Sequence, residues 1–292
     1  MQYSRRHFIK ITGGTTAGLA LCSLTGTSLF ACGNATNPAG EFGIQLYTLR
    51  DVLPGDPRGI LKQLASFGYK QIESYEGKQG MFWGMGYMDF KKYMDDLGLR
   101  IVSSHCDIQT DFERKAAEAA AIGMNYLVCP WKGPQKSLDD FKRFADEFNQ
   151  KGEICKKNGI RFAYHNHDYS FKMLDGQLPQ DVMMNGTDPA LVDFEMDIYW
   201  VVTAGMDTET WLKKYKDRFR LCHVKDRSRN PETDNGKNSV DLGTGSIDWK
   251  KILGTARENG MKYFIVEQEA YPNGSSLEAA KTDAAYMKTL GL

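Results

Sequence analysis

Residues 160–167 read IRFAYHNH, an apolar run that ends in His165, Asn166 and His167. Three later runs follow the same pattern: residues 191–197 (LVDFEMD) end in Asp197, residues 221–226 (LCHVKD) carry His223, Lys225 and Asp226, and residues 264–269 (FIVEQE) carry Glu267 and Glu269. Short apolar runs are typical of buried strands. Four runs that each end in metal-compatible side chains indicate one divalent-metal site at one end of a barrel.

Short apolar runs alternate with helical patterns from Phe42 onward. The predicted strands span residues 43–47, 71–74, 100–104, 126–129, 161–164, 191–196, 221–224 and 263–266. The predicted helices span residues 57–66, 87–97, 111–122, 138–157, 207–215, 249–258 and 276–290. Eight regularly spaced strands, most followed by a helix, predict an α/β fold, the (β/α)8 TIM barrel. A doubly wound sheet is the second choice, because no GxGxxG motif follows a strand.

The first forty residues are predicted to lie outside this fold. Residues 4–10 (SRRHFIK) match the twin-arginine export pattern, and a moderately apolar stretch follows. Cys32, within LFACG, lies in a lipobox-like motif and would be lipidated, and residues 34–40 resemble a flexible tether. We therefore expect a signal and tether in residues 1–40, a catalytic domain in residues 41–292, and export to the periplasm. A membrane-spanning anchor is the alternative, but spanning needs about 20 strongly apolar residues.

The overall composition excludes several kinds of partner. Formal net charge is zero and the pI is about 6.9, so we expect no nucleic acid partner, and membrane contact only through a lipid on Cys32. The six cysteines include no CxxC pair, so a cysteine-based zinc site is not indicated. Nothing in the sequence indicates an oligomeric state.

Residues at the carboxyl ends of barrel strands line one cavity, so the strand ends define the candidate site. Four of the five histidines lie at these ends. Imidazole and carboxylate ligands together suit Mn²⁺, Co²⁺, Zn²⁺ or Fe²⁺ better than Ca²⁺, which prefers oxygen ligands. The side chains that this rule brings together are Gln45, Tyr47, Glu73, Tyr75, Glu76, His105, Asp107, Pro130, Trp131, Lys132, His165, Asn166, His167, Asp197, Tyr199, His223, Lys225, Asp226, Glu267 and Glu269.

Eight segments after residue 42 resemble the xylose-isomerase-like TIM barrels of the sugar phosphate isomerase/epimerase superfamily. They are GIQLYTLRD (43–51), IESYEG (72–77), VSSHCD (102–107), YHNHDYSF (164–171), FEMDIYWV (194–201), HVKD (223–226), DLGTGSIDW (241–249) and VEQE (266–269). The resemblance implies one divalent ion (Mn, Co, Zn, Fe or Mg) held by His165, Asp197, His223 and Glu267. Many epimerases of the superfamily have a glutamate where this chain has His165.

The resemblance also implies a reaction: proton transfer next to a carbonyl, through a metal-stabilised enediolate. The candidate acid–base groups are His105, His167, Glu73 and Glu269. Lys225 would hold the enediolate or donate a proton, and its alternative role is an ion pair with Asp226. The residues expected to shape the sugar pocket are Gln45, Trp131, Asn166 and Tyr199. Residues 82–86 (FWGMG) are either a lid over the pocket or an ordinary packed loop.

Three functions are consistent with these residues. The first is an exported metal-dependent sugar isomerase or epimerase, and the second is a lyase that expels the aglycone from 3-keto-glycosides by the same chemistry. The third is a non-catalytic sugar-binding barrel, since fold alone does not fix function. A neutral carbohydrate is favoured over a sugar phosphate because no arginine cluster lies in the loops after strands seven and eight. An endonuclease of the same fold is disfavoured, since it would need a basic groove.

Overall fold

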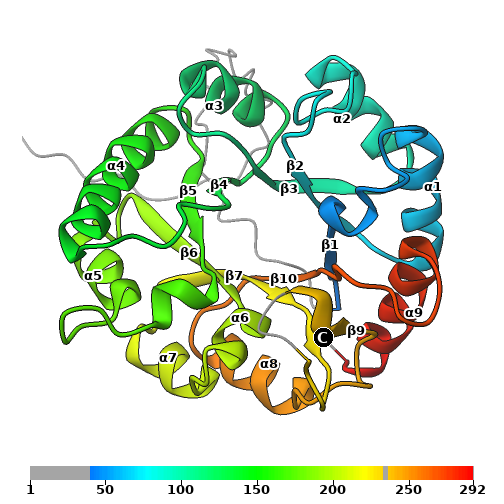
Figure 1. Ribbon diagram of the computed structural model, residues 1–292. Coiled ribbons are helices and arrows are strands. Elements are labelled where there is room, and N and C mark those ends of the chain that lie inside the picture. The colour runs from blue at the N-terminus through cyan, green and yellow to red at the C-terminus, as the bar shows by residue number, and fades with distance from the viewer. Residues whose placement is uncertain (1–39, 233–235, 292) are drawn as a thin grey trace, which may run out of the picture. The chain divides into compact units, whose positions relative to one another are not determined.

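Eight parallel strands close into a barrel in the computed structural model, which describes residues 40–232 and 236–291 (Figure 1). Around the barrel the strands follow the order β1-β10-β7-β6-β5-β4-β3-β2, so β1 pairs with both β2 and β10. The bounds are β1 Gly43–Gln45, β2 Gln71–Tyr75, β3 Arg100–His105, β4 Tyr126–Cys129, β5 Arg161–His165, β6 Val192–Asp197, β7 Phe219–Val224 and β10 Tyr263–Val266. The predicted (β/α)8 barrel is confirmed, and the doubly wound sheet is wrong.

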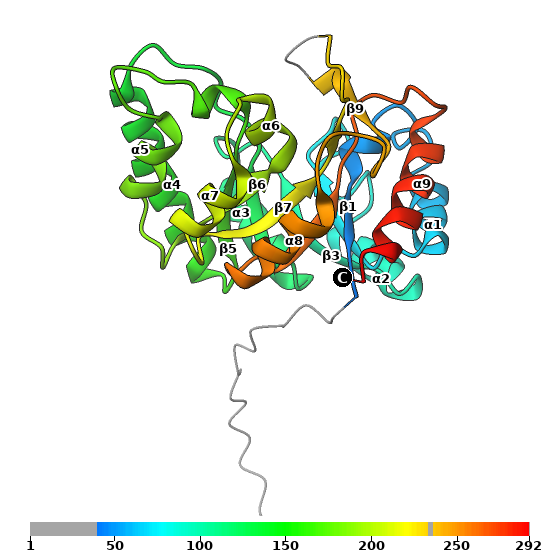
Figure 2. The same cartoon turned by 90° about the horizontal axis from the view of Figure 1, so that it is seen from below.

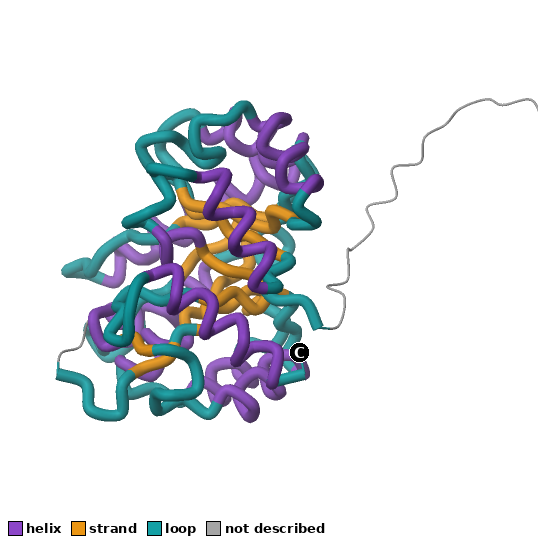
Figure 3. The backbone as a smooth tube through the Cα atoms, turned by 90° about the vertical axis from the view of Figure 1, so that its right-hand side faces the viewer, coloured by secondary structure: helices purple, strands orange, loops and turns teal. Residues whose placement is uncertain are grey.

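Helices cover the outside of the barrel, as Figure 3 shows with strands in orange and helices in purple. Their bounds are α1 Pro57–Phe67, α2 Tyr87–Asp96, α3 Phe112–Ala121, α4 Leu138–Lys157, α5 Pro179–Gly186, α6 Ile198–Thr203, α7 Thr208–Lys214, α8 Trp249–Glu258 and α9 Ser276–Thr289. Within residues 40–232 and 236–291, short 3₁₀ turns occur at η1 Leu46–Leu49, η2 Asp168–Phe171 and η3 Gly236–Asn238. None of the described helices is both long and apolar enough to cross a bilayer.

Two of these helices, α5 and α6, have no counterpart among the predicted elements. Helix α5 has only eight residues and begins at Pro179. It is too short, and its flanking residues too rich in turn formers, to show a helical pattern in the sequence. Helix α6 follows β6 with no connecting loop, because Asp197 both ends the strand and caps the helix by accepting from the backbone N–H of Trp200 at 3.1 Å. A two-stranded hairpin, β8 Asp226–Arg227 with β9 Ser239–Val240, is also additional (Figure 2).

The alternation of side chains along the strands separates the core from the site. On β6, Val192, Phe194 and Met196 pack in the main hydrophobic core, so Asp193, Glu195 and Asp197 point to the opposite face of the strand. That opposite face is the barrel interior, where an apolar cluster contains Val102, Tyr126, Val128, Ala163, Leu221, Tyr263 and Ile265. Along β7 and β10, the inward positions change from Leu221 and Ile265 to His223 and Glu267. The interior therefore changes from apolar to charged toward the carboxyl ends of the strands.

The predicted signal and tether lie outside this description. Residues 1–39, which include the twin-arginine motif and the lipobox Cys32, are not among the described residues. The barrel itself begins with Gly43 on β1, close to the predicted start of the catalytic domain at residue 41. The expectations of export and lipidation therefore stay predictions.

Candidate metal centre and substrate cavity

The four predicted metal ligands, His165, Asp197, His223 and Glu267, come together at the carboxyl ends of β5, β6, β7 and β10. We call these four residues the metal-ligand cluster. One ligand atom from each residue lies within 4.8 Å of those of the other three, and all four side chains are buried. The shortest separations join His165 Nε2 to His223 Nδ1 at 3.1 Å and His223 Nδ1 to Glu267 Oε2 at 3.2 Å. Asp197 Oδ2 lies 3.4 Å from His165 Nε2.

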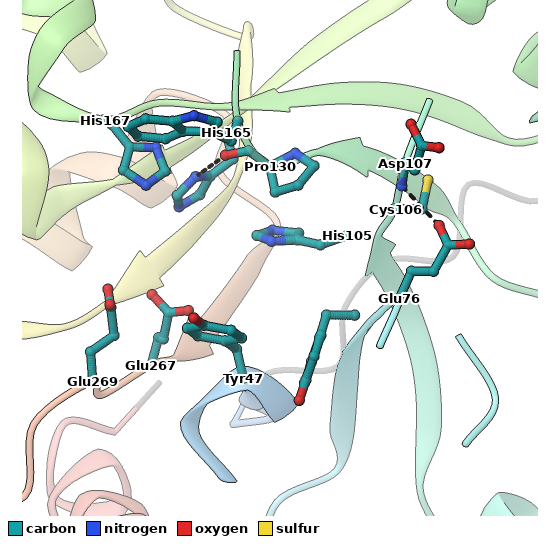
Figure 4. Close-up of a pocket in the computed structure, with 12 residues that line it drawn as sticks. Tyr47, Glu76, His105, Cys106, Asp107, Pro130, His165, His167, Glu267 and Glu269 are labelled. Atoms are coloured by element: carbon teal, nitrogen blue, oxygen red, sulfur yellow. Dashed lines mark hydrogen bonds between the residues drawn. The ribbon is translucent and has the colours of Figure 1, made fainter. Parts of the chain in front are cut away.

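These separations suit a bound divalent ion. Tetrahedral ligands about 2.0–2.2 Å from a zinc-like ion stand about 3.4 Å from one another. The separations in the cluster are close to that value, and the donors are two imidazole nitrogens and two carboxylate oxygens. The carbonyl of Pro130 hydrogen-bonds to Nδ1 of His165 at 3.3 Å (Figure 4). Nε2 of His165 is therefore the nitrogen directed at His223 and Asp197. The donor set therefore fits the predicted cofactor.

Lys225 is a fixed cation inside the same site. Its Nζ lies 2.8 Å from Asp197 Oδ2, 2.9 Å from Glu267 Oε2 and 2.8 Å from Glu269 Oε1, and the side chain is fully buried. Burial alone would lower the pKa of Lys225, but these three carboxylates raise it well above its ordinary value. Burial alone would raise the pKa of Asp197, and Lys225 instead holds it well below the usual range. The lysine therefore keeps Asp197 and Glu267 ionised.

The alternative of an ion pair between Lys225 and Asp226 is wrong. The Asp226 side chain instead accepts hydrogen bonds from backbone N–H groups, at 2.8 Å from Arg227, 2.9 Å from Gly243, 3.1 Å from Gly245 and 3.3 Å from Ile247. A side chain at position 245 would meet Asp226 Oδ1 at 2.1 Å, so only glycine fits there. Asp226 thus ties the loop before α8 to the end of β7, directly beside Lys225.

A second group of four buried side chains shares His223 with the metal-ligand cluster. We call Glu73, His105, Glu195 and His223 the floor cluster; its ligand atoms also lie within 4.8 Å of one another. His105 Nε2 is 2.7 Å from Glu195 Oε2, and His223 Nε2 is 2.7 Å from Glu73 Oε1. Burial alone would raise the pKa of Glu73, but His105 and His223 lower it to about 2. Burial and the charge of Glu73 raise the pKa of Glu195 well above its usual range.

Glu195 is a site residue that the sequence reasoning missed. It lies two positions before Asp197 on β6, so both side chains point to the same face of the strand. That period of two was available in the sequence: once Asp197 is taken as a ligand that points inward, Glu195 must also point inward. The prediction considered only the last residue of this strand and the residues after it, and it therefore left out Glu195.

A cavity of about 310 Å³ opens beside the metal-ligand cluster, and two residues of the cluster, His165 and Glu267, line it (Figure 4). Tyr47 and Tyr75 line one part of it, and other lining residues are His105, Trp131, His165, His167, Glu267 and Glu269. Trp131 is 52% exposed, and its ring packs edge-on against that of His167 with 4.4 Å between the ring centroids. Burial lowers the pKa of His105 to about 4, and it lowers the pKa of His167 well below its usual range. Two neutral imidazoles therefore face the cavity at neutral pH.

Several residues predicted to act at the site do not line this cavity. Gln45 is buried and donates to Glu73 Oε1 at 2.8 Å, so both side chains lie beneath the cavity and not at its surface. Asn166 exchanges two hydrogen bonds with the backbone of Asp197, each 3.2 Å long, and is fully buried. Tyr199 is also buried, beneath the Lys225 ammonium. These side chains support the site from behind.

The loop of residues 82–86, one of whose two expected roles was a lid, is packed against the barrel. Phe82 and Trp83 are buried, and the Trp83 indole donates to Ser74 Oγ at 3.0 Å. Ser74 in turn donates to the carbonyl of Met81 at 2.8 Å. No residue between Met81 and Gly86 lines the cavity described above. The packed-loop alternative is the one that agrees with these contacts.

Comparison with known proteins agrees with this architecture. A model of the family described as "Xylose isomerase-like TIM barrel" matches residues 61–290. An inosose dehydratase from Lacticaseibacillus casei is 26% identical over 152 residues, which are 48% of this chain and 50% of that enzyme. The chain therefore matches about half the length of that relative.

Solved structures share the fold over most of their length. A sugar phosphate isomerase/epimerase from Parabacteroides distasonis is 30% identical and superposes with a TM-score of 0.72, covering 87% of this chain and 95% of its own. The IolI protein, solved with a zinc atom, is 14% identical with a TM-score of 0.70, covering 86% of this chain and 97% of its own. At that identity the likeness to IolI is one of fold.

Proposed function

This chain belongs to the xylose isomerase-like TIM barrel family, and we propose that it is a divalent-metal-dependent enzyme that removes a proton next to a carbonyl. The first candidate is an isomerase or epimerase of a neutral sugar. The observation that carries the proposal is the convergence of His165, Asp197, His223 and Glu267 at the base of a cavity that also presents neutral imidazoles. A non-catalytic barrel would have no need to keep this buried charged set, which costs folding free energy.

The residues around the metal-ligand cluster would have different roles in the reaction. A divalent ion at the metal-ligand cluster would polarise the oxygens of the substrate as a Lewis acid. Lys225 lies beneath the cavity without lining it, and it keeps Asp197 and Glu267 ionised. Pro130 and Asn166 fix the orientation of His165 and of the backbone at Asp197.

The proton is taken up by a group that faces the cavity. His105 and His167 line it and are neutral at pH 7, so each can accept a proton. Glu269 also lines the cavity and is held by Lys225 at 2.8 Å. Glu73 cannot reach a substrate from its buried position, where Ser103 Oγ donates to it at 2.6 Å. The bases that the geometry favours are therefore His105, His167 and Glu269.

Elimination is the second candidate, and the similarity to inosose dehydratase favours it. Removal of a proton next to a carbonyl is also the first step of a β-elimination, whose second step expels a leaving group instead of returning the proton. With a 3-keto-glycoside, loss of the proton at C2 would expel the aglycone from C1. His165, in the position where many epimerases have glutamate, removes one carboxylate that could return a proton to carbon.

We also propose that the protein is exported. The support is the twin-arginine motif of residues 4–10 and the lipobox-like sequence around Cys32. Export would bring the enzyme into contact with oligosaccharides and glycosides. Fractionation of cells that produce the full chain, compared with an Arg5→Lys, Arg6→Lys double variant, tests this part separately.

Incubation in D₂O with glucosides and their 3-keto forms tests the reaction. Deuterium incorporated at a sugar carbon without cleavage indicates epimerisation, whereas release of the aglycone indicates elimination. Either activity should disappear when the metal is removed with a chelator and return when it is restored. An activity that is indifferent to the chelator and to His223→Ala would overturn the proposal.

A further inference from the structure

Two buried glutamates lie side by side within the barrel, and each is close to a different histidine. Glu73 Oε1 is 2.7 Å from His223 Nε2, whereas it is 3.4 Å from His105 Nε2. Glu195 Oε2 is 2.7 Å from His105 Nε2 and 3.5 Å from His223 Nε2. The short distances are hydrogen bonds and the long ones are not optimal for them. The geometry therefore pairs Glu73 with His223 and Glu195 with His105.

The first pair decides which nitrogen of His223 faces the metal site. A carboxylate only accepts hydrogen bonds, so when His223 binds a metal as a neutral imidazole, its proton lies on Nε2, next to Glu73. The lone pair is then on Nδ1, which lies 3.2 Å from Glu267 Oε2 and 3.6 Å from Asp197 Oδ2. Hydrogen bonding of the second imidazole nitrogen to a carboxylate fixes the tautomer and orientation of a histidine ligand.

Glu73 is itself fixed from two sides. Gln45 Nε2 donates to its Oε1 at 2.8 Å, and Ser103 Oγ donates to its Oε2 at 2.6 Å. Gln45 and Glu73 are register partners on adjacent strands β1 and β2, and Ser103 is the partner of Glu73 on β3. Three strands of the barrel thus hold one carboxylate against His223, which explains why two polar side chains are buried beneath the cavity.

The second pair orients a histidine that lines the cavity. His105 offers Nε2 to Glu195, so Nδ1 is the nitrogen that remains for a molecule in the cavity. Glu195 lies on the same strand as Asp197 and points to the same face. Its contact with His105 therefore fixes the position of His105 relative to the metal-ligand cluster. A histidine oriented by a third group is the general arrangement of an acid–base residue.

We propose that Glu73 and Glu195 are positioning residues with separate tasks, an inference that rests on the proposed metal-dependent function. Glu73 directs Nδ1 of His223 to the metal, and Glu195 directs Nδ1 of His105 to the cavity. A second ion within the floor cluster is the competing interpretation. Metal ligands would stand about 3.4 Å apart, and the two 2.7 Å contacts are shorter than that, as expected of hydrogen bonds.

Metal titration separates the two glutamates. The full chain, stripped of metal, is titrated with Zn²⁺ against a chromophoric chelator, and total metal per chain is measured after dialysis. Wild type should bind one ion, and Glu73→Gln should bind it about 10–100-fold more weakly. Glu195→Gln should keep nearly the wild-type affinity. Ser104→Ala, which removes a buried hydrogen bond at the next position of β3 without touching Glu73 or His223, is the matched control and should also change affinity little.

Histidine ¹⁵N spectra give a second measure that does not depend on activity. Long-range ¹H–¹⁵N correlations report which nitrogen carries the proton, with His105→Asn and His223→Asn used to assign signals. Glu73→Gln should disturb the tautomer pattern of His223 and leave that of His105, and Glu195→Gln should do the reverse. Thermal melting of each variant identifies one that fails to fold, and in that case Glu73→Asp or Glu195→Asp replaces it.

The number of bound ions and the affinity of each variant distinguish the positioning roles from a second metal site. Two ions in wild type, with one lost in both variants, would establish a second metal site and overturn it. One ion in wild type with unchanged affinity in Glu73→Gln would also overturn it, while the proposed function stands. A wild type that binds no ion would overturn the proposed function and this inference with it. Only the separate effects of the two variants support the positioning roles.

Discussion

Nε2 of His165 lies 3.1 Å from Nδ1 of His223, at the centre of the carboxyl end of the barrel. Pro130 and Glu73 engage the other nitrogen of each ring. If both outer nitrogens carry the protons, the two inner ones both present lone pairs and repel each other, unless a cation lies between them. Burial alone would lower the pKa of His223, but the charges of Glu195 and Glu267 raise it well above its usual range, so without metal a proton takes the place of that cation. A divalent ion bound at this point would replace that proton.

Zinc or manganese should therefore stabilise this protein, and His165 should be required for the effect. At a free metal concentration of about 100 times Kd, binding to the native state adds about 2.7 kcal/mol to the free energy of unfolding. His165→Ala should lose most of this gain, as measured by thermal melting with and without metal. His167→Ala is the control, because His167 lines the same cavity but is not in the metal-ligand cluster. Equal loss in both variants would contradict the assignment.

Replacing Lys225 with methionine should destabilise the metal-free protein strongly. The substitution leaves Asp197, Glu267 and Glu269 without their shared cation, and breaking a buried ion pair costs about 3–5 kcal/mol. Added metal should recover part of this loss, because it neutralises two of the same carboxylates. Urea unfolding with and without metal measures both effects. Lys172→Met, which breaks an exposed pair with Asp168, should cost less than about 1 kcal/mol.

Trp131→Ala should weaken substrate binding without weakening the fold. Trp131 is 52% exposed and lines the cavity, so its ring is available to the apolar face of a sugar. Loss of about 0.5–1.5 kcal/mol of aromatic contact corresponds to a KM increase of about 2- to 12-fold. The kcat and KM values for the substrate identified in D₂O, with a thermal melt of each variant, check this. Met173→Ala, exposed but away from the cavity, should change neither quantity.

The sequence predicted the metal-ligand cluster because the rule behind it is local. Each ligand directly follows or ends an apolar run, and a parallel barrel brings all carboxyl ends of its strands together. His165, Asp197, His223 and Glu267 could therefore be placed without any knowledge of loop structure. The same rule wrongly placed Gln45 at the cavity surface, because it does not say how deep in the barrel an inward side chain lies.

Other features depend on contacts between segments far apart in the chain. The pairing of Gln45 with Glu73 requires the register of β1 against β2, and the hydrogen bonds of Asp226 require residues 243–247 to fold back onto β7. Neither is visible from periodicity. Helix α6 escaped prediction because Asp197 is both the end of strand β6 and the N-cap of the helix, so no loop separates the two elements.

A pH-dependent loss of stability should come from Asp283, on α9. This carboxyl is buried, and its Oδ1 accepts from the backbone N–H of Leu242 at 2.8 Å. Burial raises its pKa from 3.8 to about 8, although the Leu242 hydrogen bond opposes the shift. Below about pH 4 the group is protonated in both the folded and unfolded states, and it does not reduce stability there.

As pH rises from about 4 to 8, the unfolded state ionises and the folded state does not, so stability falls by up to about 1.4 kcal/mol per pH unit. Asp283→Asn keeps an acceptor for Leu242 and cannot ionise, so it should become progressively more stable than wild type across this range, by a few kcal/mol near pH 8. Asp283→Ala loses the acceptor and should be about 1 kcal/mol less stable than Asp283→Asn at every pH. Urea unfolding at pH 5 and pH 8 compares the three proteins. Parallel pH profiles of wild type and Asp283→Asn would show that Asp283 ionises normally, because water or a local opening then solvates a carboxyl that the folded structure buries.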